Sequence, residues 1–292
     1  MLLTEKMQVT KFSESERAAV DFILQKGMEI EKYSTSEIAK QTFTSPSILI
    51  RVAKKLGFHG WNDLKKNYLE EVSYLESHFQ SIDANYPFGP RDNMMTVANK
   101  IASLYMESAE DTLSLVEHDA LQKAVWLLHD QKRVLVFAIG NLNYTADEFT
   151  YKMRRISRNV LHDAVQDNQF HDALMAGKED VAICLSYSGE TPTLLKTALF
   201  LKKKNVPIIA VTSLGNNSLS RLADIVLHVT TREKSYSKIA GFTSYQSVSL
   251  ILDILYSCLF NMDYNRNLEY KVDIAKEVEN DRVITNHIIE ED

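Results

Sequence analysis

Hydrophobic positions follow two different periods along the chain, and the change of period divides it near residues 78–93. Up to residue 77, apolar residues recur at helical spacing, so residues 1–77 are expected to be entirely helical. From residue 94 onward, short continuous apolar runs alternate with helical patterns, as in parallel strands that are buried on both faces. Residues 78–93 hold two prolines and a glycine within four positions and are predicted to be a linker.

The N-terminal part is predicted to contain a helix-turn-helix unit. Ser13 can cap a helix that runs to Gln25, and a short helix is expected over residues 36–41 after Ser34 or Thr35. Following a turn at 41–44, Ser45 and Pro46 have the chemistry of a cap and a first turn. The helix that they start should run to residue 56, where Gly57 closes it, and a last helix should end near residue 74.

Residues 94–292 are predicted to form an α/β domain in which a five-stranded parallel sheet is covered by helices on both faces. The expected strands are residues 133–139, 159–162, 180–185, 207–212 and 225–229. The expected helices are residues 94–116, 121–129, 144–157, 168–176, 191–203, 218–222, 244–260 and 268–289.

The stretch from residue 183 to residue 193 carries the clearest chemical signal. An apolar run ends at Ser186 and Ser188, Gly189 follows, and Thr191 and Pro192 can cap and begin a helix. A helix N-terminus offers unpaired N–H groups and a positive dipole end, so with these hydroxyls and a permissive glycine it suits a phosphate. The alternative is an ordinary capped turn between a strand and a helix.

The charge distribution points to nucleic acid at the other end of the chain. The net charge of −6 over 292 residues argues against a uniformly basic binder, yet residues 38–66 hold six cations and one acid. The residues expected to contact bases or phosphates lie on the second helix of the unit: Ser45, Ser47, Ile48, Arg51, Lys54 and Lys55. The alternative is a helical interaction domain with a solvated basic face.

Several other classes of protein are disfavoured. Cys184 and Cys258 lie in apolar segments and are expected to be buried free thiols of a reducing compartment. No spacing of cysteine and histidine indicates a metal site, and no cofactor is expected. Eighteen consecutive apolar residues occur nowhere, so the chain is expected to be cytoplasmic and not to enter a membrane.

Taken together, these motifs resemble the RpiR family of bacterial transcriptional regulators, which join a helix-turn-helix domain to a sugar isomerase (SIS) domain. The resemblance covers nearly the whole chain. The strings that carry it in the first part are FSESER at 12–17, STSEIA at 34–39, TSPSILIR at 44–51 and KLGFHGW at 55–61. In the second part they are LSYSGET at 185–191 and the helix after 242–244 that contains Asp253.

The resemblance implies a flavodoxin-like sheet, a homodimer or higher homo-oligomer assembled through SIS helices, operator DNA as a partner and a phosphorylated sugar or amino sugar as effector. Its effector-binding residues would be Ser186, Ser188, Gly189 and Thr191, with Gly140 and Asn141 from the loop after the first strand. Two positions depart from the family pattern: Leu142 stands where a hydroxyl often contacts the ligand, and Tyr245 stands where the family often has an arginine. Asn141 or Asn143 could supply the missing polar contact.

An isomerase is the main alternative, since some SIS domains interconvert aldose and ketose phosphates. The side chains that could move a proton are Glu148, Glu190, Glu233, His162 and His171. No carboxylate and histidine stand at a spacing that forces them together, and a DNA-binding unit is hard to explain on a metabolic enzyme. A third possibility is a SIS protein whose helical domain binds another protein. The interpretation carried forward is a transcriptional regulator without catalytic activity.

Overall fold

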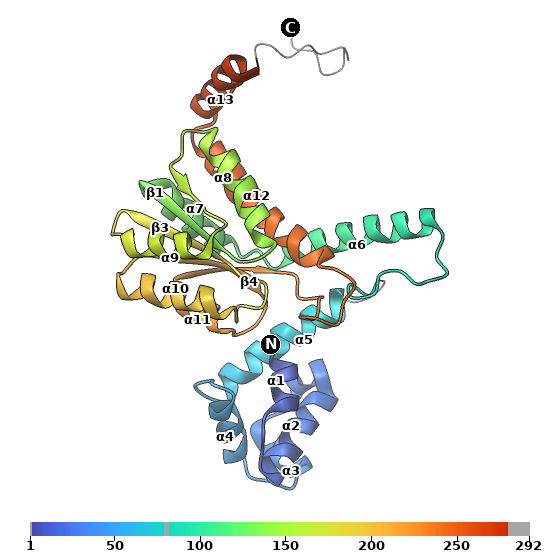
Figure 1. The fold of residues 1–292 in the computed structure, drawn as a ribbon. Coiled ribbons are helices and arrows are strands. Elements are labelled where there is room, and N and C mark those ends of the chain that lie inside the picture. Colours follow the sequence, from blue (N-terminus) through green and yellow to red (C-terminus); the bar gives the residue numbers. More distant parts are fainter. Residues whose placement is uncertain (1, 79–81, 280–292) are drawn as a thin grey trace.

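A helical part is followed by a mixed α/β part, as the hydrophobic pattern predicts (Figure 1). The computed structural model describes residues 2–78 and 82–279. The helices of the first part are α1 (Leu3–Val9), α2 (Glu14–Lys26), a 3-10 helix (Gly27–Lys32), α3 (Thr35–Gln41), α4 (Ser47–Lys55) and α5 (Trp61–His78).

The second part alternates helices and strands. Its helices are α6 (Met94–Ser114), α7 (His118–Asp130), α8 (Leu142–Arg154), α9 (Gln166–Met175), α10 (Pro192–Lys203), α11 (Ser218–Leu222), α12 (Phe242–Met262) and α13 (Tyr264–Glu279). Its strands are β1 (Arg133–Ala138), β2 (Val160–Leu161), β3 (Asp180–Leu185), β4 (Ile208–Ser213) and β5 (Ile225–Val229). Residues 280–289 of the last predicted helix lie outside the described residues.

The five strands form one parallel sheet in the order β2-β1-β3-β4-β5. This is the flavodoxin-like order, in which ligands bind at the carboxyl ends of the strands beside the point where the order reverses. Here that point lies between β1 and β3, and the loops that follow these two strands carry Gly140 and Ser186.

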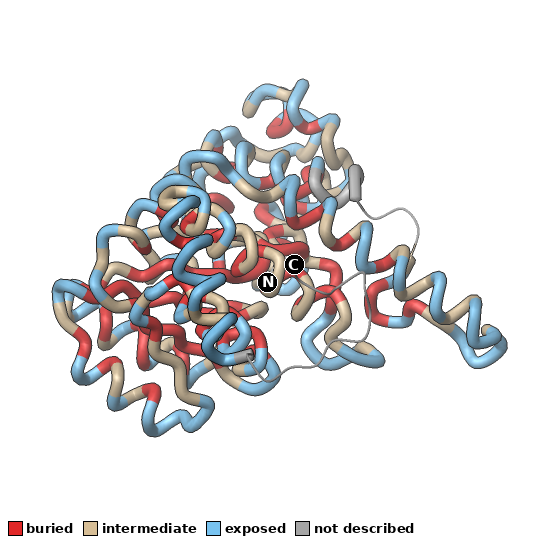
Figure 2. The backbone as a smooth tube through the Cα atoms, turned by 90° about the horizontal axis from the view of Figure 1, so that it is seen from above, coloured by how far each residue is buried: buried red, intermediate tan, exposed pale blue. Residues whose placement is uncertain are grey.

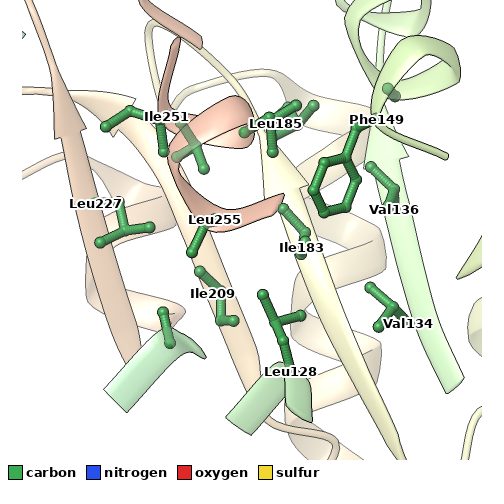
Figure 3. Close-up of a cluster of buried hydrophobic side chains, with 14 of the residues drawn as sticks. Leu128, Val134, Val136, Phe149, Ile183, Leu185, Ile209, Leu227, Ile251 and Leu255 are labelled. Carbon is green, nitrogen blue, oxygen red and sulfur yellow. The ribbon is translucent and has the colours of Figure 1, made fainter. Parts of the chain in front are cut away.

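Alternate strand residues face two separate hydrophobic cores, because successive side chains of a strand point to opposite faces. Val134, Val136 and Ile183 pack with α7, α8 and α12 on one face (Figure 3). Leu135, Phe137 and Cys184 pack with α9, α10 and α11 on the other. The central strands β3 and β4 are accordingly buried at every position, and buried backbone runs through the middle of the molecule (Figure 2).

The helical domain has its own core, to which α1 contributes Leu3 and Met7. Sequence patterning missed α1 and the 3-10 helix, which are too short to show a helical period. Ser34 and Ser13 cap α3 and α2 as expected, each through a reciprocal bond with a glutamate three residues on. Ser45 does not cap α4: the cap position is Pro46, and the Ser45 hydroxyl contacts that of Ser47 at 2.8 Å.

Candidate functional site

The loop between β3 and α10 folds around its own hydroxyl groups. The Ser186 Oγ accepts the N–H of Gly189 at 3.1 Å and lies 2.9 Å from the Thr191 Oγ1. The Ser188 Oγ accepts the N–H of Glu190 at 3.2 Å. Thr191 holds the cap position of α10 and Pro192 its first turn, but the Thr191 side chain makes no capping hydrogen bond. Its hydroxyl is therefore directed to the loop and not to the helix backbone.

Gly189 is required by a neighbouring side chain as well as by its backbone angle. Its φ is +65°, and a Cβ added there would lie 2.0 Å from the Oδ1 of Asn217. Asn217 is buried, donates to the Thr212 Oγ1 at 3.0 Å and accepts the N–H of Ser220 at 2.9 Å. The loop after β3 is thereby packed against the loop after β4.

A cavity of about 230 Å³ opens beside this loop at the carboxyl edge of the sheet. Ser186, Ser188 and Thr191 line it, as predicted from the sequence. The other lining residues come from the loop after β1, from β3, from the loop after β5 and from the start of α12: Ile139, Leu142, Leu185, Tyr187, Ser235, Lys238, Ser244 and Tyr245. We refer to it as the small cavity.

The loop after β1 contributes differently from what the sequence suggested. Gly140 has a φ of +65° and, like Asn141, is exposed, and neither residue is among those that line the small cavity. The Oδ1 of Asn143 faces the amide of Gln169 at 3.4 Å. The expected ligand contact of Gly140 and Asn141 therefore has no support in this geometry, whereas the two departures from the family pattern, Leu142 and Tyr245, both line the cavity.

Sequence analysis considered Glu233 only as a side chain that could move a proton, and it missed the structural role of this residue. Its side chain is fully buried, and its carboxylate lies at the N-terminus of α12. It accepts hydrogen bonds from the N–H and hydroxyl groups of Thr243 and Ser244 and from the Nζ of Lys238 at 2.8 Å. Nothing in the spacing of these residues could have paired a loop carboxylate with a helix that begins nine residues later.

Lys238 is a cation that lines the small cavity together with the loop hydroxyls. Its side chain is 18% exposed, and its Nζ lies 5.6 Å from the centre of the Tyr187 ring. Because a single lysine in an irregular loop has no motif, only the folded chain brings it to the site.

A second cavity of about 760 Å³ adjoins the small one, and we refer to it as the large cavity. Tyr187, Ser188 and Ser235 line both. The other walls of the large cavity include residues 82–85 and residues 231–237.

The side chains considered for proton transfer do not gather at the small cavity, and none of the five lines it. Glu148 is exposed and pairs with Lys152, whereas Glu190 accepts the N–H of Ser218 at 2.8 Å. The remaining three are no better placed: Glu233 lines the large cavity with its carboxylate held as described, His162 faces the carbonyl of Val136, and His171 is exposed.

In the helical domain, Ser47, Arg51 and Lys54 are exposed on α4 and Ser45 is exposed just before it, and these are four of the six predicted DNA-contacting residues. The prediction for Ile48 is wrong, since this residue is 3% exposed and packs in the domain core. Lys55 is half-exposed, but its Nζ lies 2.9 Å from the Oε2 of Glu16. This contact and the bond from Ser13 lower the pKa of Glu16, the bond from Ser13 contributing most.

Two exposed apolar side chains in and before α4 were not anticipated. Phe43, in the turn between α3 and α4, is 98% exposed and has a φ of +53°. Ile50 on α4 is 47% exposed. A left-handed backbone is costly for a residue that has a Cβ, so the exposed ring of Phe43 is held at a conformational cost with no packing in return.

Both cysteines are free, and Cys184 is buried as predicted, which raises its pKa to about 12. Cys258 is only half-buried, so the expectation of burial was wrong for that residue. Across residues 2–78 and 82–279, no helix has the length and apolar character needed to cross a bilayer.

Comparison with known proteins gives a family for each part of the chain. Residues 1–74 match the helix-turn-helix domain of the rpiR family, and residues 127–258 match the SIS domain. An uncharacterized HTH-type transcriptional regulator of Haemophilus influenzae is 27% identical over 85% of both chains. Another, from Clostridium perfringens, is 26% identical over 96% of this chain and all of its own.

The fold as a whole is also found among solved structures. The Vibrio vulnificus NanR protein, complexed with ManNAc-6P, superimposes with a TM-score of 0.62 at 18% identity, over 96% of this chain and 100% of NanR. This chain therefore joins a helix-turn-helix domain of the rpiR family, residues 1–74, to a SIS domain, residues 127–258, and it is similar over most of its length to HTH-type transcriptional regulators.

Proposed function

We propose that this regulator senses a phosphorylated sugar, whose phosphate binds in the small cavity at the N-terminus of α10. The observation that carries the proposal is the convergence of Ser186, Ser188 and Thr191 on a cavity at the start of that helix. Hydroxyl donors and a helix N-terminus both favour an oxyanion. Lys238 also lines this cavity, but its ammonium is paired with Glu233, so the hydroxyls and the helix N-terminus carry the proposal.

The size of the small cavity limits what it can hold. At about 230 Å³ it lies below the usual range for a small-molecule site, about 300–1,000 Å³. A phosphate with a few carbon atoms fits such a space, and Leu142 and Tyr245 offer an apolar surface to those carbons. The complex of NanR with ManNAc-6P, in a protein of the same fold, supports a sugar phosphate as the ligand class.

On the DNA side, we propose that the first turn of α4 enters the major groove. Ser45, Ser47, Phe43 and Ile50 would then meet base edges or thymine methyl groups, and Arg51 and Lys54 would contact guanine or phosphates. We leave Lys55 out of this face because its ammonium is bound to Glu16.

A homodimer would present two such helices to the half-sites of a near-palindromic operator. The long helix α6 supports this assembly, because its N-terminal half extends away from the body of the domain (Figure 1). It also exposes Met94, Met95, Met106 and Leu113, each more than 60% accessible. A second copy of the chain would cover this apolar side, and the measurement that checks it is the molar mass in solution.

The proposed role is regulatory and not catalytic, because the candidates for proton transfer are held elsewhere or exposed. Effector binding would change operator affinity through a coupling free energy of about 1–3 kcal/mol, which is about 5–150-fold. An isomerase remains the alternative, and it requires turnover of the bound sugar.

The test uses the full-length chain and a duplex selected from random sequence. We expect one or more hexose 6-phosphates to raise the melting temperature, because a ligand that binds only the folded state stabilises it. The same ligand should change the dissociation constant of the selected duplex in fluorescence anisotropy. Binding of the helical domain to another protein, with no salt-sensitive DNA affinity, would contradict the DNA assignment, and conversion of the sugar followed by NMR would favour the isomerase.

A further inference from the structure

The large cavity is built by both parts of the chain, in contrast to the small cavity. Leu2 and Glu5 line it from the start of the helical domain, and residues 82–85 line it from the predicted linker. Residues 231–237 form the wall on the SIS side. A ligand that continues from the small cavity past Tyr187 and Ser188 therefore reaches the linker and α1.

The linker is fixed to this wall through Asn85, which is only 8% exposed. The Oδ1 of Asn85 accepts the N–H of Lys234 at 2.7 Å, and its carbonyl accepts the N–H of Ile239 at 2.9 Å. Its Nδ2 donates to the carbonyl of Arg232 at 3.3 Å. These three bonds span a loop that contributes Ser235 and Lys238 to the small cavity, so a displacement of the loop also displaces the linker.

The linker also gives the large cavity a chemical preference. The Oδ1 of Asp83 accepts the backbone N–H of Asn85 at 2.8 Å, and this bond holds the pKa of Asp83 below its usual value. Glu5 supplies a second carboxylate on the α1 side. Carboxylates accept hydrogen bonds from hydroxyl and amino groups and repel a second anion. Arg232 and Lys234 also line the cavity, so its charge is mixed. The carboxylates of Asp83 and Glu5 form the part of the wall that suits the hydroxyl or amino groups of a sugar better than a second phosphate.

We propose that the effector spans both cavities, with its phosphate at α10 and its sugar end against Asp83 and Asn85 of the linker. The proposal rests on the proposed function. It adds which part of the effector the linker recognises and which linker residues contact that part. A ligand shifts a conformational equilibrium only by its difference in affinity for the two states. Phosphate alone contacts only the SIS side, whereas the sugar end also contacts the linker that joins the SIS domain to the helical domain, so only the sugar end can favour one position of the linker.

The first experiment compares inorganic phosphate, the hexose 6-phosphate that binds best, and the corresponding 1,6-bisphosphate on the full-length chain. We expect hydrogen exchange of residues 82–85 to slow with the hexose 6-phosphate and not with inorganic phosphate. Operator affinity should change with the hexose 6-phosphate alone, and the bisphosphate should bind at least about 10-fold more weakly. Equal protection of residues 82–85 by inorganic phosphate would overturn the proposal.

Two variants test the residues themselves. Asp83→Asn should reduce the discrimination against the bisphosphate by about 10-fold, because it removes the carboxylate that the linker places against the sugar end. Asn85→Ala should reduce the operator response to the hexose 6-phosphate at least 10-fold, with a smaller change in apo operator affinity. Arg91→Ala, at an exposed linker position, is the matched control and should alter neither ratio.

The outcomes separate the two proposals. If no phosphorylated sugar binds the wild-type chain, the proposed function fails and the spanning effector fails with it. If a hexose 6-phosphate binds and both variants respond as the wild type does, only the role of the linker fails. Hydrogen exchange on the wild-type chain decides the matter even where a variant does not fold.

Discussion

Two of the helices that begin at the carboxyl edge of the sheet, α10 and α12, satisfy their N-termini in different ways. The N-terminus of α12 is filled from within the chain, because the buried carboxylate of Glu233 accepts the N–H groups of Thr243 and Ser244. At the N-terminus of α10, the neighbouring hydroxyl groups bond only to one another and to the turn, beside an open cavity. The same physical preference for an anion is thus met by protein at one helix and left for a ligand at the other.

Helix α4, which we propose enters the major groove, resembles α10 in this respect. Its cap residue, Pro46, offers no side-chain acceptor, and the hydroxyls of Ser45 and Ser47 bond to each other in solvent. Both helices that are expected to meet a phosphate therefore begin with hydroxyl groups and without an acidic residue in the first turn. Among α4, α10 and α12, the two helices proposed to bind a phosphate begin without an internal carboxylate, and α12 begins with one.

Replacing the buried carboxylate of Glu233 should have the largest effect on the free energy of unfolding. We expect Glu233→Ala to lower the free energy of unfolding by about 3–5 kcal/mol, since it leaves Lys238 and the donors of α12 without their buried partner. Urea denaturation measures the change. Glu190→Ala is the matched control, because it removes an exposed carboxylate that also binds a helix N-terminus, and it should cost less than about 1 kcal/mol. Equal losses for both variants would mean that burial of the Glu233 carboxylate is not the cause.

A substitution in the turn before α10 should lower the free energy of unfolding by nearly as much, for a steric reason. In Gly189→Ala the new Cβ would meet the Asn217 side chain at a backbone angle that alanine rarely adopts. We expect a loss of about 2–4 kcal/mol, from strain and from the hydrogen bonds that Asn217 must break. Thermal unfolding checks this value. Gly177→Ala is a suitable control because nothing lies within 4 Å of its added Cβ, and a similar loss there would show that crowding is not the cause.

Phosphate binding at the N-terminus of α10 can be tested without unfolding the protein. We expect Ser186→Ala with Ser188→Ala to weaken hexose phosphate binding by about 100-fold, because each hydroxyl bond to an anion contributes about 1.5–3 kcal/mol, partly replaced by water. Isothermal titration calorimetry measures the affinity, and apo operator binding should stay within about twofold of the wild type. Unchanged effector affinity would place the phosphate elsewhere.

Much of this molecule was predictable from the sequence where the relevant residues are neighbours in the chain. The hydroxyls of residues 186–191 and the start of α10 follow one another, so motif and geometry coincide. Glu233, Lys238 and Asn85 were not predictable as a group, because they meet only after the loop after β5 has folded against α12 and the linker. Ile48 was misassigned for a related reason: position along α4 does not reveal which face is buried until α2 is packed against it.

The basic residues of α4 should contribute to DNA affinity in a way that depends on salt concentration more than on base sequence. Arg51→Ala and Lys54→Ala should each reduce the slope of log affinity against log salt concentration by about one, because each removes one phosphate contact. Anisotropy titrations at several salt concentrations provide the slopes. Lys123→Ala, an exposed lysine on α7, removes the same charge from the SIS domain and should leave the slope unaltered. If all three variants keep the wild-type slope, α4 does not face the duplex.

The smallest expected effect on stability concerns Phe43, which is exposed and has a left-handed backbone in the turn before α4. Phe43→Gly relieves a left-handed backbone and loses no packing, so the free energy of unfolding should rise by about 0.5–1 kcal/mol or stay constant. Affinity for the selected operator should fall by about 10-fold if the ring contacts thymine methyl groups, with little change on non-specific duplex. Val9→Ala trims another exposed apolar side chain of the same domain and should change neither quantity. A stabilised Phe43→Gly variant with full operator affinity would mean that the exposed ring has no part in DNA recognition, and that the strain at this turn serves another contact.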